Sequence, residues 1–302
     1  MGNGNGNGNG SGPEARAVVV GSSRFETSPS VLLRAGAGFR LEDVDPDATP
    51  GFSGTKEEGA AALLASDGEL DALQERLFAA SRVGARNSVL LILQAMDTAG
   101  KGGIVRHVMG SADPQGIHHH AFKAPTDEDR AHDFLWRVER QLPEAGIIGV
   151  FDRSHYEDVL VQRVRGLAAP EEIERRYGAI RQFEELVAGG GTRIVKVMLH
   201  ISKDEQRDRL LERLDRPDKH WKFGPGDIDE RRRWDDYMEA YRIAIERTRT
   251  DDAPWYVVPA NKKWYARIAV QQLLIDVLHA IDPQWPAPAF DVAEQRRRLA
   301  KS

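Results

Sequence analysis

The chain has 302 residues, of which 41% are hydrophobic and 29% are charged, and its net charge of −5 excludes a global attraction to nucleic acid or to anionic membranes. The absence of cysteine excludes disulfides, thiolate metal sites and a cysteine nucleophile. Because the sequence also lacks an 18-residue apolar run and a signal-peptide pattern, we expect a cytoplasmic enzyme with neither a membrane nor a nucleic-acid partner.

The first part of the chain has little capacity to bury apolar surface. Residues 1–13, MGNGNGNGNGSGP, have low complexity and predict a disordered Gly/Asn tail. Residues 14–56 are rich in Gly, Pro and Asp and predict an irregular N-terminal arm laid over the domain. The next segment has leucines at helical spacing and predicts a helix with Asp67 as its N-cap.

From residue 88 onward, apolar runs of strand length alternate with helical patterns. The predicted strands are 88–94, 146–151, 193–199 and 255–259, with a weaker one at 117–123. The predicted helices are 102–109, 126–141, 154–164, 170–188, 202–214, 227–249 and 264–281. Apolar strands separated by helices are typical of a parallel sheet covered on both faces, so we predict a three-layer α/β domain with five parallel strands. Residues 289–302 are basic and predict a solvated C-terminal tail.

The turn after the first strand carries a lysine among glycines, in AMDTAGKGG at 95–103. A glycine-rich turn that leads into a helix exposes backbone N–H groups, which suit a phosphate, and Lys101 adds a positive charge. The sequence is a degenerate form of the phosphate loop G-x-x-x-x-G-K-[ST], with Ala95 and Gly102 at the two departures. A turn whose glycines merely allow tight packing is the alternative.

In the ordinary phosphate loop, a Ser or Thr hydroxyl at the position of Gly102 binds Mg²⁺, so another group must hold the metal here. Two aspartates are candidates for this role. Asp97 lies inside the loop, and Asp152 ends the strand GIIGVFD. If the two strands are neighbours, both carboxylates meet at one edge of the sheet, where they can share Mg²⁺. A helix N-cap is the alternative role for Asp152. Arg153 is expected to bind a phosphate, or else to pair with Glu157 one turn later.

Two later segments place cations near the same edge. Basic residues flank a Gly-Pro-Gly break within 213–235 and predict a helical lid, for which a salt-bridged surface is the alternative. Lys262, Lys263 and Arg267 begin the last long helix, where cations oppose the helix dipole, so we expect an anion to compensate them.

Two other patterns are interpreted as structural. His118, His119 and His120 are consecutive on a strand and point to opposite faces, so they cannot converge on one metal ion. Trp234, Tyr237, Met238 and Tyr241 follow helical spacing and predict a core-facing stripe.

Several long segments resemble the polyphosphate kinase 2 family, and within it class III. They include LQAMDTAGKGG (93–103), FKAPTDEDRAHDFLWRVERQLPEAGIIGVFDRSHYEDVLVQRV (122–164), LHISKDEQRDRLLERLDRPDKHWKF (199–223) and APWYVVPANKKWY (253–265). Together with FRLEDVDPDATPGF (39–52) and RRRWDDYMEAY (231–241), they span most of residues 31–288. Two departures from the family are Ala95, where the family usually has Gly, and Asp152, where class III has Asn.

The resemblance implies a thymidylate-kinase-like P-loop fold over residues 57–288, with a lid at about 213–235. It implies reversible phosphoryl transfer between inorganic polyphosphate and adenine or guanine nucleotides (AMP or ADP as acceptor), with Mg²⁺ as cofactor and Mn²⁺ as the alternative. It also implies a homo-oligomer, a dimer or a tetramer.

The resemblance also assigns site residues. Catalytic roles fall on Asp97, Lys101, Asp152 and Arg153, with the two aspartates as metal ligands. The phosphate loop adds Thr98, Ala99, Gly100, Gly102 and Gly103; the nucleotide and lid contacts are Glu157, Arg163, Arg216, Lys219 and Lys222; the polyphosphate path is Arg106, Lys262, Lys263 and Arg267.

Two rival functions share this fold. One is an ATP-dependent nucleotide kinase, and the other is a P-loop protein that binds a nucleotide without transferring phosphate.

Overall fold

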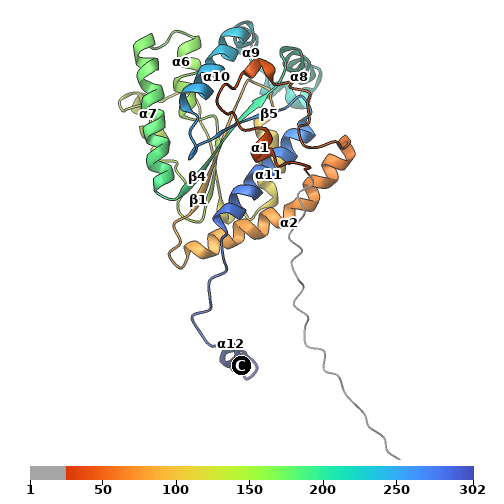
Figure 1. Ribbon diagram of the computed structural model, residues 1–302, viewed down its shortest axis with the longest axis vertical. Coiled ribbons are helices and arrows are strands. Elements are labelled where there is room, and N and C mark those ends of the chain that lie inside the picture. Colours follow the sequence, from red (N-terminus) through yellow and green to blue (C-terminus); the bar gives the residue numbers. More distant parts are fainter. Residues whose placement is uncertain (1–24) are drawn as a thin grey trace, which may run out of the picture.

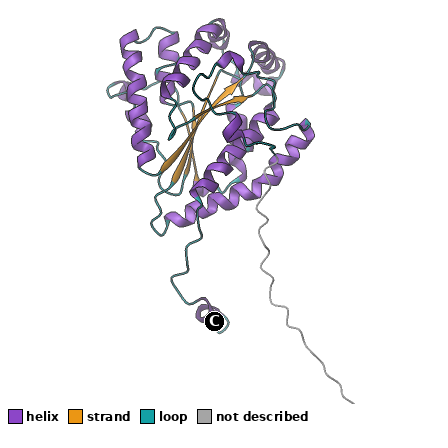
Figure 2. Ribbon diagram, in the orientation of Figure 1, coloured by secondary structure: helices purple, strands orange, loops and turns teal. Residues whose placement is uncertain are grey.

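The computed structural model describes residues 25–302, which form a five-stranded parallel sheet between two layers of helices (Figures 1 and 2). The strands are β1 (Ser88–Ala95), β2 (Ile117–Ala121), β3 (Ile148–Asp152), β4 (Thr192–His200) and β5 (Trp255–Pro259). They lie in the order β2-β3-β1-β4-β5, and all pairs are parallel. The predicted three-layer α/β fold is confirmed.

Helices cover both faces of the sheet, which explains why every residue of β1 is buried. On one face lie α2 (Lys56–Ser81), α3 (Lys101–His107) and α11 (Lys263–Ile281). On the other lie α6 (Val161–Val164), α7 (Pro170–Gly189) and α10 (Trp234–Thr248) (Figure 1). Two further helices, α8 (Lys203–Asp215) and α9 (Gly226–Arg232), lie near the carboxyl ends of the strands. Within residues 25–302, no helix has the length and hydrophobicity of a membrane span.

The helix α2 begins well before the predicted start. Thr55 caps it through a capping box, in which its hydroxyl accepts from the N–H of Glu58 while the Glu58 carboxylate accepts from the N–H of Thr55. Asp67 lies inside the helix, and its carboxylate accepts a hydrogen bond from Gln271 of α11 at 2.8 Å. Asp67 as the N-cap is therefore wrong, because the local signal at Thr55 extends the helix and Asp67 serves helix packing instead.

Three predicted helices are broken. The segment 126–141 contains only α4 (Asp127–Arg130) and α5 (Trp136–Glu139), because a capping box at Thr126 closes one isolated turn. The segment 154–164 divides into a 3-10 turn at His155–Asp158 and α6. The segment 227–249 divides into α9 and α10 at Arg233, whose guanidinium donates to the carbonyl of Val164 at 2.8 Å.

The N-terminal arm covers the edge of the sheet at β5. Its only α-helix among the described residues is the short α1 (Pro29–Leu32), and it forms an isolated antiparallel bridge between Arg34 and Tyr256 of β5. Farther along the arm, the carbonyl of Pro46 accepts from the N–H of Asn261 at 3.1 Å. Because an unpaired edge strand is prone to association, this contact protects β5. The predicted tail at 1–13 and residues 14–24 of the predicted arm lie outside the described residues.

A network of charged and polar side chains lies inside the core. The ammonium of Lys196 on β4 donates to Glu184 of α7 at 2.6 Å and to the carbonyl of Thr248 at 2.8 Å. His155 and the hydroxyl of Tyr156 contact the second oxygen of the same carboxylate at 3.2 and 2.8 Å. All five residues are at most 1% exposed. This network joins α7, β4 and α10 to the segment that follows β3.

The C-terminal helix α12 (Val292–Leu299) extends away from the sheet and its covering helices (Figure 1). It lies within the predicted tail at 289–302.

Candidate active site

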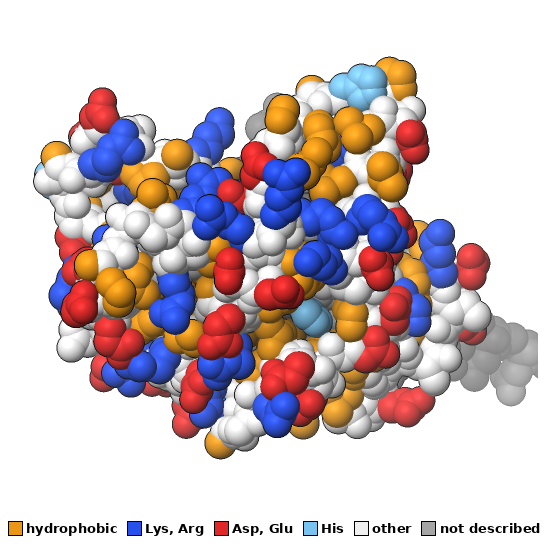
Figure 3. Space-filling model, turned by 90° about the horizontal axis from the view of Figure 1, so that it is seen from above, with side chains coloured by type: hydrophobic (Ala, Val, Ile, Leu, Met, Phe, Trp, Pro, Cys, Tyr) orange, Lys and Arg blue, Asp and Glu red, His pale blue; other side chains and the backbone are white. Residues whose placement is uncertain are grey.

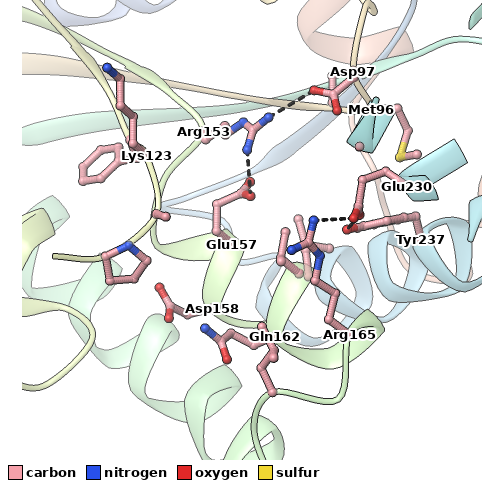
Figure 4. Close-up of a pocket in the computed structure, with 18 of the residues that line it drawn as sticks. Met96, Asp97, Lys123, Arg153, Glu157, Asp158, Gln162, Arg165, Glu230 and Tyr237 are labelled. Carbon is pink, nitrogen blue, oxygen red and sulfur yellow. Dashed lines mark hydrogen bonds and ion pairs between the residues drawn. The ribbon is translucent and has the colours of Figure 1, made fainter. Parts of the chain in front are cut away.

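The carboxyl ends of β1 and β3 bring the predicted catalytic residues together. Leu93 of β1 is in register with Asp152 of β3, and the N–H of Arg153 donates to the carbonyl of Leu93 at 3.0 Å. Beyond these strand ends, the Arg153 guanidinium donates to the carboxylate of Asp97 at 3.0 Å (Figure 4). The expectation that the two strands are neighbours is confirmed. Their pairing places the loop after β1 beside the segment after β3.

The loop after β1 has an anion-binding shape. Gly100, the N-cap of α3, has φ +117°, and Thr98 is in the left-handed region at φ 69°. The Lys101 ammonium turns back to the carbonyl of Ala95 at 3.2 Å. Among residues 25–302, the N–H groups of Thr98, Gly100, Lys101 and Gly102 have no hydrogen-bond acceptor. Unpaired amides beside a lysine suit a phosphate group.

Arg153 is held in an unusual backbone conformation, with φ 66°. A non-glycine residue in the left-handed region costs free energy and persists only where its surroundings fix it. The side chain of Arg153 is 40% exposed and lies between Asp97 and Glu157, with an Nη1–Oε2 distance of 3.6 Å to Glu157. The guanidinium is therefore fixed by two carboxylates and still accessible to a ligand.

Glu157 is a carboxylate of this site whose pKa the fold perturbs. Burial raises its pKa above the ordinary value, while Arg153 and Lys101 partly oppose the shift. Its carboxylate is thus poorly solvated, and the two nearby cations only partly compensate the loss of solvation.

The two aspartates have the donor chemistry that Mg²⁺ requires. Asp152 is partly exposed, and within residues 25–302 its carboxylate accepts no hydrogen bond and forms no close ion pair, whereas the carboxylate of Asp97 contacts Arg153. In the part of the chain that the structure describes, no group of three or more His, Asp or Glu side chains could hold a metal alone. Mg²⁺ at phosphoryl-transfer sites is commonly bound by one or two carboxylates together with substrate phosphates and water, so these residues fit that ion.

A cavity of about 410 Å³ opens beside Asp97 and Arg153 (Figure 4). Its wall near β3 includes Phe122, Lys123, Arg137, Asp158 and Gln162. Its opposite wall comes from α6, α9 and α10 and includes Arg165, Asp227, Glu230, Tyr237 and Tyr241. Glu230 accepts hydrogen bonds from Arg165 and from the Tyr237 hydroxyl, and these bonds join α9 to the end of α6 and to α10.

Most of these cavity residues were missed in the sequence. Tyr237 and Tyr241 were predicted as core, and they are indeed 6% and 3% exposed, but they also line the cavity. Arg137 and Asp158 contact each other at 3.4 Å, although no short motif connects them. Only the helical spacing of the aromatic stripe was a usable signal, and spacing alone does not distinguish a core face from a cavity wall.

The predicted lid cations do not line this cavity. Arg216 pairs with Asp218 at 2.8 Å, Lys219 lies 3.8 Å from the same carboxylate, and Lys222 lies over the ring of Trp221. Arg163 is exposed on α6 and is also absent from the cavity wall. Of the predicted lid segment, the acids Asp227 and Glu230 line the cavity instead.

The cations of the predicted polyphosphate path lie on the α3 and α11 side of the loop. The Arg267 guanidinium lies beside Gly103, so that a Cβ atom at Gly103 would come 3.8 Å from it, and burial lowers the pKa of Arg267. Lys262 is exposed, and Lys263 lies 3.7 Å from Glu212 of α8. Arg106 is exposed on α3. In the view from above, Lys and Arg side chains gather across the middle of the face, with Asp and Glu side chains among and below them (Figure 3).

Comparison with known proteins gives consistent results. The family described as polyphosphate kinase 2 matches residues 53–286. The crystal structure of polyphosphate kinase 2 from Arthrobacter aurescens is 60% identical, with a TM-score of 0.91, and the match covers 92% of this chain and 98% of that one. An AMP/ADP-polyphosphate phosphotransferase from Meiothermus ruber is 47% identical over 83% of this chain and 92% of its own. An ADP-polyphosphate phosphotransferase from Rhodopseudomonas palustris is 41% identical over 89% and 98%.

Proposed function

The chain belongs to the polyphosphate kinase 2 family, and on this premise we propose that it transfers a phosphoryl group reversibly between inorganic polyphosphate and a nucleoside mono- or diphosphate. The observation that carries the proposal is the meeting of Asp97, Lys101 and Arg153 at the ends of β1 and β3. These groups lie between a nucleotide-sized cavity and a separate set of cations on α3 and α11.

The two sides of the loop suit the two substrates. We assign the cavity to the nucleotide, whose terminal phosphate would meet Arg153, and the cations Lys262, Lys263 and Arg267 to polyphosphate. The terminal phosphate of the polyphosphate chain would lie on the loop at Lys101. The attacking phosphate oxygen is already anionic, so the reaction needs no general base. This chain contributes alignment of the two phosphates and positive charge on the transferred group.

We infer that Asp97 and Asp152 would hold Mg²⁺, or Mn²⁺ in its place. The ion supplies further charge neutralisation on the phosphate oxygens when it is bound. We also expect a homo-oligomer, a dimer or a tetramer, which light scattering would test.

The decisive experiment is to measure ATP formation from ADP and polyphosphate with Mg²⁺ present, and ADP formation from AMP. We expect activity with both acceptors, a steep loss of activity with added salt, and near-complete loss in Lys101→Met. Lys56→Met, at an exposed position that begins α2, is the control and should keep wild-type activity. A donor preference for ATP over polyphosphate would indicate a nucleotide kinase, and nucleotide binding without transfer would indicate a non-catalytic protein.

A further inference from the structure

The helix α8 holds the phosphate loop from behind. Gln206 and Arg209 lie three residues apart on α8, face the same way, and are 1% and 5% exposed. The Gln206 amide donates to the carbonyl of Asp97 at 3.2 Å, and the Arg209 guanidinium donates to the carbonyl of Thr98 at 3.0 Å. Two consecutive carbonyls of the loop are therefore bound from the protein interior.

The same guanidinium also binds the loop that follows β5. Its Nη2 donates to the carbonyls of Ala260 and Asn261 at 2.7 and 2.9 Å. Its Nε donates to Glu205 at 2.6 Å, which balances the buried charge and fixes the plane of the guanidinium. Arg209 thus joins two loops that are 160 residues apart in the chain but that each carry a cation for the proposed polyphosphate.

This linkage explains how the loop keeps its shape. Thr98 has φ 69°, a conformation that a β-branched residue avoids unless its neighbours enforce it. When the carbonyls of Asp97 and Thr98 point toward α8, the loop's unpaired N–H groups are left for the ligand. A planar guanidinium can reach Thr98, Ala260 and Asn261 together, whereas the ammonium of a lysine cannot offer that fork of donors.

We propose that Arg209 is a positioning residue that fixes the distance between the phosphate loop and the loop after β5, so that one polyphosphate chain can contact Lys101 and Lys262 at the same time. The inference rests on the proposed function. Arg209 itself is too deeply buried to touch the substrate, so its effect would pass through the two loops.

The test is the dependence of kcat/KM on polyphosphate chain length in Arg209→Gln and Arg209→Lys. In the wild-type protein, kcat/KM should rise with length as the chain comes to span both loops. In both variants this advantage of long over short polyphosphate should fall roughly tenfold, because misplacing one loop breaks simultaneous contact. Arg207→Gln is the control, because Arg207 is an exposed residue of the same helix that pairs only with Asp204 and Asp208.

A merely structural role for Arg209 predicts a different result. Partial unfolding would lower the rates with long and short chains equally, so an unchanged ratio between them would overturn the inference. Circular dichroism would check that the variants are folded. The dissociation constant for long polyphosphate would be measured without nucleotide, and an unchanged affinity in the variants would also overturn the inference. If Arg209→Gln does not fold, Arg209→Lys keeps the charge beside Glu205 and carries the test. A wild-type protein that makes no ATP from polyphosphate would instead refute the proposed function.

Discussion

Two clusters of charged side chains lie next to the segment that follows β3, and they differ in how completely the fold satisfies them. In the buried network, Lys196 donates to Glu184, to the hydroxyl of Tyr156 and to the carbonyl of Thr248, all within 3.0 Å. In the candidate active site, Arg153 has one close carboxylate at 3.0 Å and a second at 3.6 Å, and within residues 25–302 the Asp152 carboxylate accepts no hydrogen bond. The first cluster fixes the core, and the second keeps binding capacity for a ligand.

The two glutamates of these clusters have pKa shifts of opposite sign. Burial alone would raise the pKa of Glu184, but Lys196 and His155 outweigh it and the pKa lies below its ordinary value. Burial raises the pKa of Glu157, because Arg153 and Lys101 only partly compensate. The comparison indicates that the fold stabilises the charge of Glu184 and tolerates that of Glu157.

The largest effect on stability is expected from Glu184→Ala. Removing this carboxylate leaves the Lys196 ammonium buried without its anion, so the free energy of unfolding should fall by about 3–5 kcal/mol. Urea unfolding measures the change, and Glu185→Ala, at the exposed position next to it, is the control. Equal stability of the two variants would show that the network contributes nothing.

The second largest effect is expected on catalysis, from Asp97→Asn. Loss of this charge should lower kcat by about 100- to 1000-fold, as for other groups that act on the charge of a transition state. Because the ion pair with Arg153 is partly exposed, unfolding should change by less than about 1 kcal/mol. Asp251→Asn, which disturbs only an exposed pair with Arg34, should leave both quantities unchanged. Near-normal kcat in Asp97→Asn would remove this residue from the site.

A third effect separates the two glutamates by pH. Because folding raises the pKa of Glu157 above 4.5, this residue favours the folded state at low pH, and that contribution is lost as the pH rises through the folded pKa. Glu157→Gln should therefore have a higher Tm than the wild type at pH 7 and no such gain near pH 4.

Glu184→Gln should behave in the opposite way. Its lowered pKa means that the carboxylate stabilises the fold above pH 4.5, and this contribution is lost as the pH falls through the folded pKa. The substitution should therefore lower Tm at pH 7 and have a smaller effect in acid. Thermal unfolding from about pH 3 to pH 8 would test both variants, and differences that do not depend on pH would contradict the comparison.

The smallest effect is expected from Arg216→Ala in the predicted lid segment. Arg216 is exposed and pairs with Asp218 and Glu212 on the surface, where ion pairs contribute little. We expect an unchanged Tm and only a modest rise in the KM for polyphosphate. A large loss of kcat would mean that Arg216 reaches the transferred phosphate.

Much of the fold could be predicted from the sequence, because apolar runs bounded by turn residues report strands directly. All five strands were found, and the Lys101 loop and Asp152 were placed at strand ends. The segment 126–141 was not predicted correctly, because isolated capped turns look like a continuous helix when only spacing is considered. The cavity walls at Arg137 and Tyr237 were not predicted as such, because nothing local marks a residue whose partner is far along the chain.

By itself, the sequence determined the succession of strands and helices along the chain, the glycine and lysine of the phosphate loop, and the resemblance to one family. All of these depend on residues that are neighbours in the sequence. Only the tertiary structure decided that Arg153 reaches Asp97, and that Arg209 holds Thr98 against the loop after β5. The physical reason is that these contacts depend on which strands pair and how α8 packs, and the packing of the whole chain sets both.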